Sequence, residues 1–223
     1  MKYVCSDIHG HYNVYLKAVE KLNADDALYI LGDVIDRGPD GIKIIKDMMT
    51  RENVVFLLGN HEDMMLKSML MGERFLANWT SPNNGGTATY QAFCKLPSVE
   101  QEEILDWMES RPIYLKVSCA GETYHLVHAS WGRELVDVSE YHQKCTRDYP
   151  DRLWDSEFRG DLVANALDGT TIVGHVPVIR FGKEVAPFHL ENTINIDGGL
   201  AYGGGLILYC LDTKEYEVLK KKS

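Results

Sequence analysis

The heptapeptide Gly32-Asp33-Val34-Ile35-Asp36-Arg37-Gly38 follows directly on the apolar run Leu28 to Leu31. Two similar blocks lie on either side of it in the chain: Asp7-Ile8-His9-Gly10 after Tyr3 to Cys5, and Gly59-Asn60-His61-Glu62 after Val54 to Leu58. Short apolar runs that end in glycine and polar residues are typical of buried strands. Each block is therefore expected at a strand end, together with its carboxylate, amide and imidazole groups.

Three later apolar runs end in the same way. Tyr124 to Val127 precedes His128, Thr171 to Gly174 precedes His175, and Thr193 to Ile196 precedes Asp197-Gly198-Gly199. Six strands are thus expected, each of which delivers polar side chains at its carboxyl end.

Helical patterns separate the early strands. Apolar residues share a face in Tyr15, Val19 and Leu22, in Ile42, Ile45 and Met49, and along Met64 to Leu76. A capping box of Ser98 and Gln101 is expected to open a further helix. Alternating strands and helices followed by mostly strands indicate a layered α/β sandwich, with central sheets flanked by helices. Because ligands bind beyond the carboxyl ends of strands in such folds, we expect the polar strand-end residues to form one active site there.

Length and composition restrict the class of protein. With 223 residues, 45% of them hydrophobic, the chain is expected to form a single catalytic domain over residues 1–219, followed by a basic tail at 220–223. No apolar stretch approaches the ~20 residues that cross a bilayer, and the N-terminus has no signal-peptide pattern, so a cytoplasmic protein without membrane association is expected. The net charge of -10 disfavours duplex nucleic acid as a partner. The five cysteines form no C-x-x-C pair, which argues against a thiolate zinc site.

The strand-end residues form a set of nitrogen and oxygen donors. Asp7 and His9 lie two residues apart, so their side chains leave an extended backbone on the same side and can share one cation. Asp33 can bridge two cations through its two carboxylate oxygens. Further donors are available from Asn60, His128 and His175. This donor set suits two divalent cations such as Mn²⁺, Fe or Zn²⁺.

The three blocks, in this order and spacing, resemble the signature of the phosphoprotein phosphatase branch of the calcineurin-like metallophosphoesterases. The resemblance extends from Asp7 to Gly205 and is greatest to the bacterial and bacteriophage-type Ser/Thr protein phosphatases. Diadenosine tetraphosphatases are near relatives of that group. The resemblance implies a dinuclear metal-dependent hydrolase of phosphoric esters, with Mn²⁺ as the expected metal.

The resemblance also implies roles for individual residues. Asp7, His9 and Asp33 would hold the first metal, and Asp33, Asn60, His128 and His175 the second. A hydroxide that bridges the metals would attack phosphorus in line, and His61 would protonate the leaving oxygen. Asp36 would orient His61, whereas Arg37 would bind the phosphoryl oxygens together with Asn60.

The chain departs from the family pattern at some positions. Eukaryotic relatives carry His-Gly-Gly where this chain has His128-Ala129-Ser130, so their regulatory contacts are not expected here. The family has a second phosphate-binding arginine near a Trp-Asp pair; Trp154-Asp155 is followed by Ser156, which leaves Arg159, or alternatively Arg152, for this role. Asn84-Gly85-Gly86 resembles a glycine-rich loop beside the cleft but fits an ordinary turn equally well. Asp197 either supports a ligand histidine or holds the Gly198-Gly199 turn.

Three functions are consistent with these residues. The expected one is a Ser/Thr protein phosphatase that acts on a phosphoprotein, a phosphopeptide or a small phosphorylated substrate. A dinucleoside polyphosphate hydrolase shares every catalytic residue and differs only in how the leaving group is bound. A non-catalytic module that binds phosphorylated partners is the third, and His61 with Asp36 argues against it because binding alone needs no proton donor. The motifs do not separate the first two functions, and they do not indicate an oligomeric state.

Overall fold

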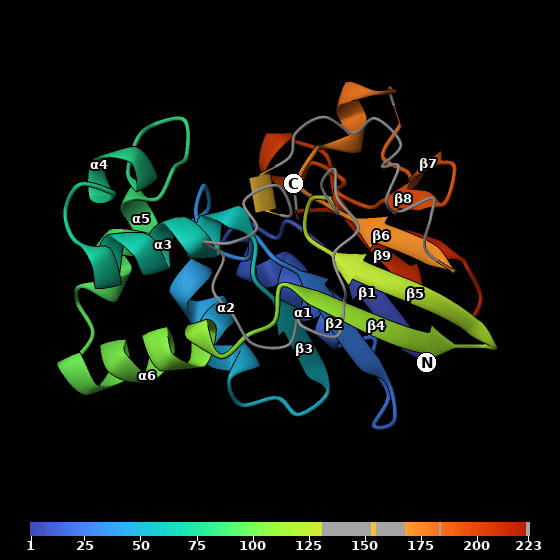
Figure 1. The fold of residues 1–223 in the computed structure, drawn as a ribbon, viewed down its shortest axis with the longest axis horizontal. Coiled ribbons are helices and arrows are strands. Elements are labelled where there is room, and N and C mark those ends of the chain that lie inside the picture. Colours follow the sequence, from blue (N-terminus) through green and yellow to red (C-terminus); the bar gives the residue numbers. More distant parts are fainter. Residues whose placement is uncertain (131–152, 155–167, 183, 222–223) are drawn as a thin grey trace.

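Two five-stranded sheets form the centre of the computed structural model, which describes residues 1–130, 153–154, 168–182 and 184–221 (Figure 1). The first sheet has the order β10 (Tyr216–Leu219), β9 (Leu206–Cys210), β1 (Lys2–Cys5), β2 (Ala27–Leu31) and β3 (Val54–Leu57). The second has the order β4 (Tyr114–Cys119), β5 (Glu122–Val127), β6 (Thr170–Val173), β8 (Thr193–Asn195) and β7 (Phe188–Leu190).

Each sheet contains a parallel core with antiparallel strands beside it. Strands β1, β2 and β3 run parallel, and β9 pairs antiparallel with β1. Strands β5, β6 and β8 also run parallel, with β4 and β7 antiparallel at the two edges. The parallel strands include all six strands expected from the sequence, so six polar carboxyl ends are presented by the two sheets.

The helices pack on the face of the first sheet that is turned away from the second sheet. In Figure 1, α3, α4, α5 and α6 lie to the left of the strands. They are α1 (Tyr12–Val19), α2 (Gly41–Met48), α3 (Asn60–Met71), α4 (Leu76–Trp79), α5 (Thr87–Phe93) and α6 (Ser98–Glu109), with short 3₁₀ turns η2 (Val178–Arg180) and η3 (Leu200–Tyr202). Helix α4 packs on α3, and α5 packs on α2. The described helices include none that is long and apolar enough to cross a bilayer.

Alternation along the first sheet separates two apolar layers. Cys5 and Ile30 pack with the helices, whereas the next positions, Val4 and Leu31, pack against the second sheet. Because successive side chains of a strand point to opposite faces, both faces of this sheet are buried. The layers are therefore helices, first sheet and second sheet, and the expected layered α/β architecture is confirmed.

Two details differ from the sequence expectation. The helix that begins at Asn60 stops at Met71, where Gly72 adopts a φ of 100° that breaks the Met64 to Leu76 stretch. The Ser98–Gln101 capping box is wrong: Pro97 is the N-cap residue of α6, and the Gln101 side chain donates to the Leu96 carbonyl instead. The Pro97 carbonyl accepts the backbone N–H of Gln101 at 3.1 Å, which begins the hydrogen bonding of the helix.

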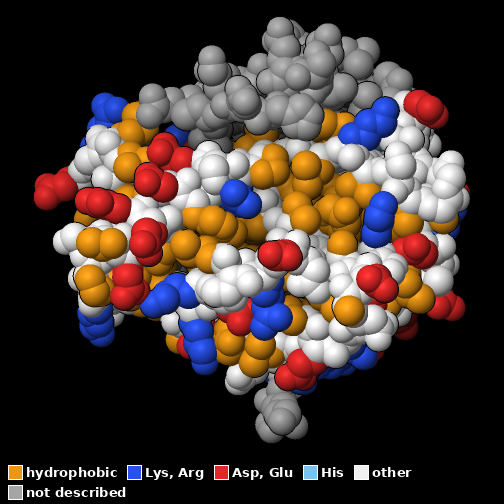
Figure 2. All heavy atoms as spheres, turned by 90° about the horizontal axis from the view of Figure 1, so that it is seen from below, with side chains coloured by type: hydrophobic (Ala, Val, Ile, Leu, Met, Phe, Trp, Pro, Cys, Tyr) orange, Lys and Arg blue, Asp and Glu red, His pale blue; other side chains and the backbone are white. Residues whose placement is uncertain are grey.

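The described part of one face carries charges of both signs. Figure 2 shows acidic and basic side chains interspersed there, with apolar side chains between them. No continuous basic stripe crosses the described part of this face.

Candidate metal centre

The loops after the strands adopt a backbone conformation that L-residues rarely use. Nine non-glycine residues in the described ranges have a positive φ, and six of them are predicted site residues: Asp7, His9, Asp33, Asp36, Arg37 and His175. Such conformations cost on the order of 1–3 kcal/mol each and persist only where surrounding structure enforces them. The backbone is thus strained mainly where the sequence placed the site.

Glycines allow the loops to approach one another closely. A Cβ on Gly59 would lie 2.3 Å from Asp33 Oδ1, and one on Gly174 would lie 1.8 Å from Ser6 Oγ and 2.4 Å from Asp7 Oδ2. No side chain fits at these positions, so the Gly59-Asn60-His61 block meets the Asp33 loop directly. The glycines of these blocks are therefore required by packing.

Glu62 holds the Asp33 loop to the start of α3. Its Oε2 accepts hydrogen bonds from the backbone N–H of Asp33 at 2.8 Å and of Gly59 at 2.9 Å. Its Oε1 accepts from Val34 at 2.9 Å and from Ile35 at 3.3 Å. The sequence analysis assigned no role to Glu62. The signal that could have identified it is its place three residues after Gly59, where a Glu caps a helix N-terminus.

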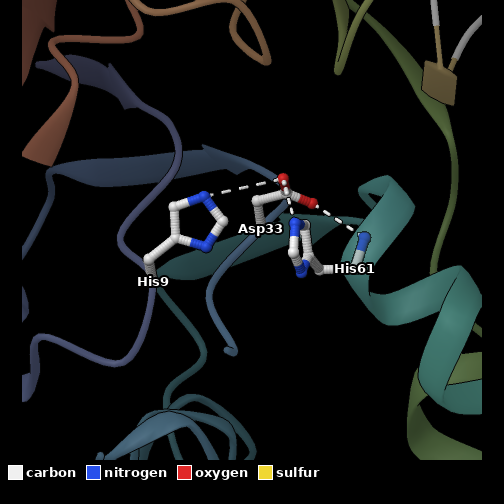
Figure 3. A group of neighbouring side chains, drawn as sticks. All are labelled: His9, Asp33 and His61. Atoms are coloured by element: carbon white, nitrogen blue, oxygen red, sulfur yellow. Dashed lines mark hydrogen bonds and ion pairs between the residues drawn. The ribbon is translucent and has the colours of Figure 1, made fainter. Parts of the chain in front are cut away.

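Asp33 lies between two groups of imidazoles. Its Oδ2 is 3.8 Å from Nε2 of both His9 and His61, and its Oδ1 is 3.5 Å from Nε2 of His128. Figure 3 shows the His9 and His61 rings on either side of the Asp33 carboxylate. Two sets of atoms lie close enough to share a cation, one from His9, Asp33 and His61 and one from Asp33, His128 and His175. Asp33 belongs to both sets, in keeping with the bridging position that the sequence suggested.

Asp7 and His175 border the same place. Asp7 Oδ1 is 3.7 Å from His9 Nε2, while Asp7 Oδ2 accepts hydrogen bonds from Ser6 Oγ and from the backbone N–H of His175, the latter at 2.9 Å. The His175 ring meets that of His128 edge-on at 5.1 Å. All six predicted metal ligands, Asp7, His9, Asp33, Asn60, His128 and His175, are thus brought together.

Hydrogen bonds to the backbone fix which nitrogen the histidines present. The Nδ1–H of His9 donates to the Ile35 carbonyl at 3.0 Å, and that of His128 donates to the Leu31 carbonyl. In both rings Nε2 keeps its lone pair and lies within 3.8 Å of a carboxylate oxygen of Asp33; in His9 this nitrogen also accepts a hydrogen bond from Arg37. Metal-ligating histidines are commonly held in this way, with the second nitrogen bound to a carbonyl or carboxylate.

One contact tests whether a cation fits. His128 Nε2, which carries a lone pair, faces Asn60 Oδ1 at 3.0 Å, and the amide oxygen is also an acceptor. Two acceptors at this distance repel unless a cation lies with them. Oxygen and imidazole ligands without thiolate suit Mn²⁺, Fe or Zn²⁺, so the residues present fit a divalent metal.

Burial disfavours the charged form of each of these groups, which suits a cation at the histidines and is opposed by a cation at Asp33. Burial raises the pKa of Asp33 well above its ordinary value, and the nearby carboxylates of Asp7 and Glu62 add to the shift. Burial lowers the pKa of His9 and His175 well below theirs, which keeps the rings neutral. A cation favours ionised carboxylates and neutral imidazoles, so it would relieve the cost of burying these acids.

A second buried cluster lies beside the donors. The Nδ1–H of His61 donates to Asp36 Oδ2 at 2.7 Å, and the indole N–H of Trp79 donates to the same oxygen at 2.8 Å. Burial raises the pKa of Asp36 to about 7, although hydrogen bonds from Thr89 and Trp79 and the charge of Arg37 oppose the shift. His61 Nε2 has no hydrogen-bond partner among the described residues and is directed toward Asp33. The arrangement leaves this nitrogen available to a bound molecule.

Arg37 is exposed, in contrast to its neighbours in the loop. Its Nη1 contacts His9 Nε2, and its guanidinium lies 5.2 Å from the centre of the Tyr202 ring. A planar guanidinium at the rim of the site can bind phosphoryl oxygens through two parallel hydrogen bonds.

The remaining predicted residues are placed only in part. Arg159 and Arg152 lie outside the described residues, as does Asp155. Gly85 of the Asn84-Gly85-Gly86 segment contacts the site loop through its carbonyl, which accepts the Arg37 N–H at 3.1 Å. Asp197 Oδ1 accepts the Gly199 N–H at 2.9 Å, a contact that holds the glycine turn.

Comparison with known proteins agrees with the fold. Residues 3–207 match the family model of the calcineurin-like phosphoesterases. The chain is 24% identical to the asymmetrical bis(5'-nucleosyl)-tetraphosphatase PrpE of Geobacillus sp. (strain WCH70), over 92% of this chain and 88% of the relative. It is 27% identical to serine/threonine-protein phosphatase 1 of Salmonella typhimurium, over 92% of this chain and 89% of the relative. The structure of a cold-active protein-tyrosine phosphatase of Shewanella sp. is similar with a TM-score of 0.58 and 19% identity, over 98% of this chain and 80% of that one, a likeness in fold.

Proposed function

The chain belongs to the calcineurin-like phosphoesterase family and is a metal-dependent phosphoester hydrolase, and we propose that it acts as a Ser/Thr protein phosphatase. The observation that carries the proposal is the position of Asp33, which is shared by two sets of donor atoms and lies 3.8 Å from Nε2 of His61. Among the residues that the structure describes, this nitrogen has no hydrogen-bond partner. A two-metal site with a proton donor against it suits hydrolysis of a phosphate monoester.

The proposed ligands differ from the two sets of neighbouring atoms in that Asp7 and Asn60 are added and His61 is kept as the proton donor. Asp7, His9 and Asp33 hold one divalent cation, and Asp33, Asn60, His128 and His175 hold the other, with Mn²⁺ as the proposed metal. When bound, such a pair neutralises charge on the phosphoryl oxygens and lowers the pKa of water so that a nucleophile exists near neutral pH.

The side chains around the metals bind the substrate and move the proton. Arg37 binds two phosphoryl oxygens through its guanidinium, and the Asn60 side chain lies beside them. Proton donation from His61 Nε2 to the leaving oxygen uses the imidazolium form of the ring, because Nδ1–H already donates to Asp36 at 2.7 Å. Burial lowers the pKa of His61, and the Asp36 carboxylate offsets that cost while it fixes the direction of the donor. General acid catalysis of this kind contributes about 10²–10⁴-fold to the rate.

The assay that tests the proposal begins with protein purified without chelator. Metal analysis should find two divalent ions per chain, and the Mn²⁺-loaded protein should release phosphate from p-nitrophenyl phosphate and from a phosphoserine or phosphothreonine peptide. Metal-loaded protein that hydrolyses neither substrate would contradict both the activity and the assigned roles, and would favour a binding module.

A dinucleoside polyphosphate hydrolase is the second candidate. The observation that favours it is the similarity to the Geobacillus tetraphosphatase over most of both chains. The value of kcat/KM on diadenosine tetraphosphate, measured beside that on the phosphopeptide with one metal-loaded sample, separates the two. A large preference for the nucleotide would reverse the order of the two candidates.

A further inference from the structure

The Asp36 carboxylate connects His61 to a residue of a different helix. Asp36 Oδ2 accepts the His61 Nδ1–H at 2.7 Å and the Trp79 indole N–H at 2.8 Å, so one oxygen is shared by both donors. All three side chains are fully buried. A buried carboxylate is stable in one orientation only when donors fix it there. Trp79 is the second donor to Oδ2, and Oδ1 has no hydrogen-bond partner among the described residues.

The segment that contains Trp79 holds the Asp36 loop at three points. In addition to the indole contact, the Thr89 Oγ1 of α5 accepts the Asp36 N–H at 3.0 Å, and the Gly85 carbonyl accepts the Arg37 N–H at 3.1 Å. Asp36 and Arg37 have φ values of 67° and 62°. Two successive non-glycine residues with positive φ keep this strained conformation only when neighbouring segments hold it. Here α4, α5 and the turn between them hold it through the three contacts.

Gly86 makes room for the N–H edge of the indole. A Cβ at this position would lie 2.6 Å from Nε1 and Cδ1 of the Trp79 indole and 2.6 Å from the Trp79 carbonyl oxygen, so it would displace both the ring and the backbone of Trp79. The backbone of Gly86 has a φ of -73°, which alanine adopts without strain. Glycine is therefore needed at position 86 for the close approach to Trp79 rather than for its backbone conformation.

We propose that Trp79 is a positioning residue for proton donation, because its indole N–H holds Asp36 in the orientation that directs His61 Nε2 into the site. The inference rests on the proposed function in that His61 is taken as the proton donor. Trp79 touches neither metal nor substrate and acts through Asp36. Gly86 maintains the position of the indole.

Two variants test the proposal independently. Trp79→Phe removes the N–H and keeps an aromatic ring, whereas Gly86→Ala keeps the N–H and pushes it out of place. Trp107→Phe is the matched control, because Trp107 stacks on Phe56 and belongs to α6, outside the acid pair and its contacts. Should Trp79→Phe fail to fold, Gly86→Ala decides the question.

The kinetic measurement uses two monoesters that differ in their leaving group. Phenyl phosphate needs a proton on the departing oxygen, whereas 2,4-dinitrophenyl phosphate leaves as a stable anion. We expect each variant to lower kcat on phenyl phosphate about 10-fold and to change kcat on the dinitrophenyl ester less than about 2-fold. The control should leave both values within about 2-fold of wild type. An equal loss on the two esters would overturn the proposal, because it would mean a general structural effect.

A double variant tests whether Trp79 acts through His61. In a His61→Asn background, Trp79→Phe should change kcat on phenyl phosphate less than about 2-fold, since residues that act as a unit are not additive. A full additional 10-fold loss in that background would contradict the proposal.

A spectroscopic measurement keeps the inference separate from the proposed function. In protein labelled with ¹⁵N-histidine, the His61 Nδ1–H, assigned by its loss in His61→Asn, should exchange with water faster in Trp79→Phe and Gly86→Ala than in wild type or Trp107→Phe. Unchanged exchange in both variants would overturn the inference even in an active enzyme. If the wild type hydrolyses no phosphoester, the proposed function fails, and the exchange rates still decide whether Trp79 holds the pair.

Discussion

The predicted metal ligands form one half of the site, and the acid pair of Asp36 and His61 forms the other half. Both halves are built from the same loops, but they are held in different ways. His9 and His128 donate their Nδ1–H to backbone carbonyls, of Ile35 and Leu31, that belong to the end of β2 and the loop after it. His61 instead donates to a side chain, Asp36, which depends on Trp79 and Thr89 of the α4–α5 segment. The histidines proposed as metal ligands are thus tied to the end of β2 and the loop after it, whereas the proposed proton donor is tied to the α4–α5 segment. The two functions can therefore be damaged separately.

The largest effect is expected from substitution of Asp33, which belongs to both sets of donor atoms and lies beside His61. Asp33→Asn removes the charge shared by both donor groups and should lower kcat/KM at least ~10³-fold, with fewer than two metals per chain. Metal analysis and phosphatase assays on the same sample provide the check. A variant that retained two metals and wild-type turnover would refute the bridging role.

The next largest effect is expected from substitution of His61, which should affect proton donation without affecting metal binding. His61→Asn should reduce kcat on a poor leaving group by about 10²-fold or more while metal content stays unchanged, because His61 is the proposed proton donor and not a proposed ligand. The comparison between phenyl and dinitrophenyl esters applies here too. Loss of metal from this variant would show instead that His61 belongs to the donor group, as its 3.8 Å distance from Asp33 allows.

Glu62 accepts hydrogen bonds from the backbone of the Asp33 loop and from Gly59 at the start of α3. Its removal should therefore lower the stability of the folded protein. Glu62→Ala leaves four buried N–H groups without their acceptor and is expected to lower the free energy of unfolding by about 2–4 kcal/mol. Urea unfolding measures this. Glu62→Gln keeps one acceptor oxygen and should fall between Ala and wild type; equal stability of all three would mean that the loop holds its conformation without this side chain.

The smallest effect is expected far from either half. Burial raises the pKa of Asp47, but hydrogen bonds from Arg51 and Tyr15 outweigh it, so the folded-state pKa lies below the ordinary value. Its contribution is present above the unfolded-state pKa of about 4 and is lost as the pH falls through the folded-state pKa. Between pH 7 and pH 3, the free energy of unfolding should fall by no more than about 0.5 kcal/mol further in the wild type than in Asp47→Asn.

Urea unfolding at the two pH values measures the Asp47 effect, and phosphatase activity at pH 7 should be the same for both proteins. A large change in activity on this substitution would show that the α1–α2 contact is coupled to the site. It would contradict the expectation that Asp47 affects stability alone.

The sequence predicted the strands and the donors better than their supports. The apolar runs before Asp7, Asp33, Asn60 and His128 fixed the strand ends by a local pattern, and the strands are where that pattern placed them. Trp79, Thr89 and Gly86 lie in a stretch without periodicity, and their contacts arise only when α4 and α5 pack beside α3 and α2. The positive φ values of the loops likewise have no signal in Asp, His or Arg, because it is the surrounding packing that enforces them.

Strand β1 pairs with β2 on one side and with β9, about two hundred residues later, on the other. A nascent chain therefore has the loop that bears Asp7 and His9 long before the strand that completes the sheet around it emerges from the ribosome. Contacts so distant in sequence form slowly because the intervening chain must first be brought together. Until then one edge of β1 is open to pairing with other chains, which makes the last strands a safeguard against aggregation during synthesis.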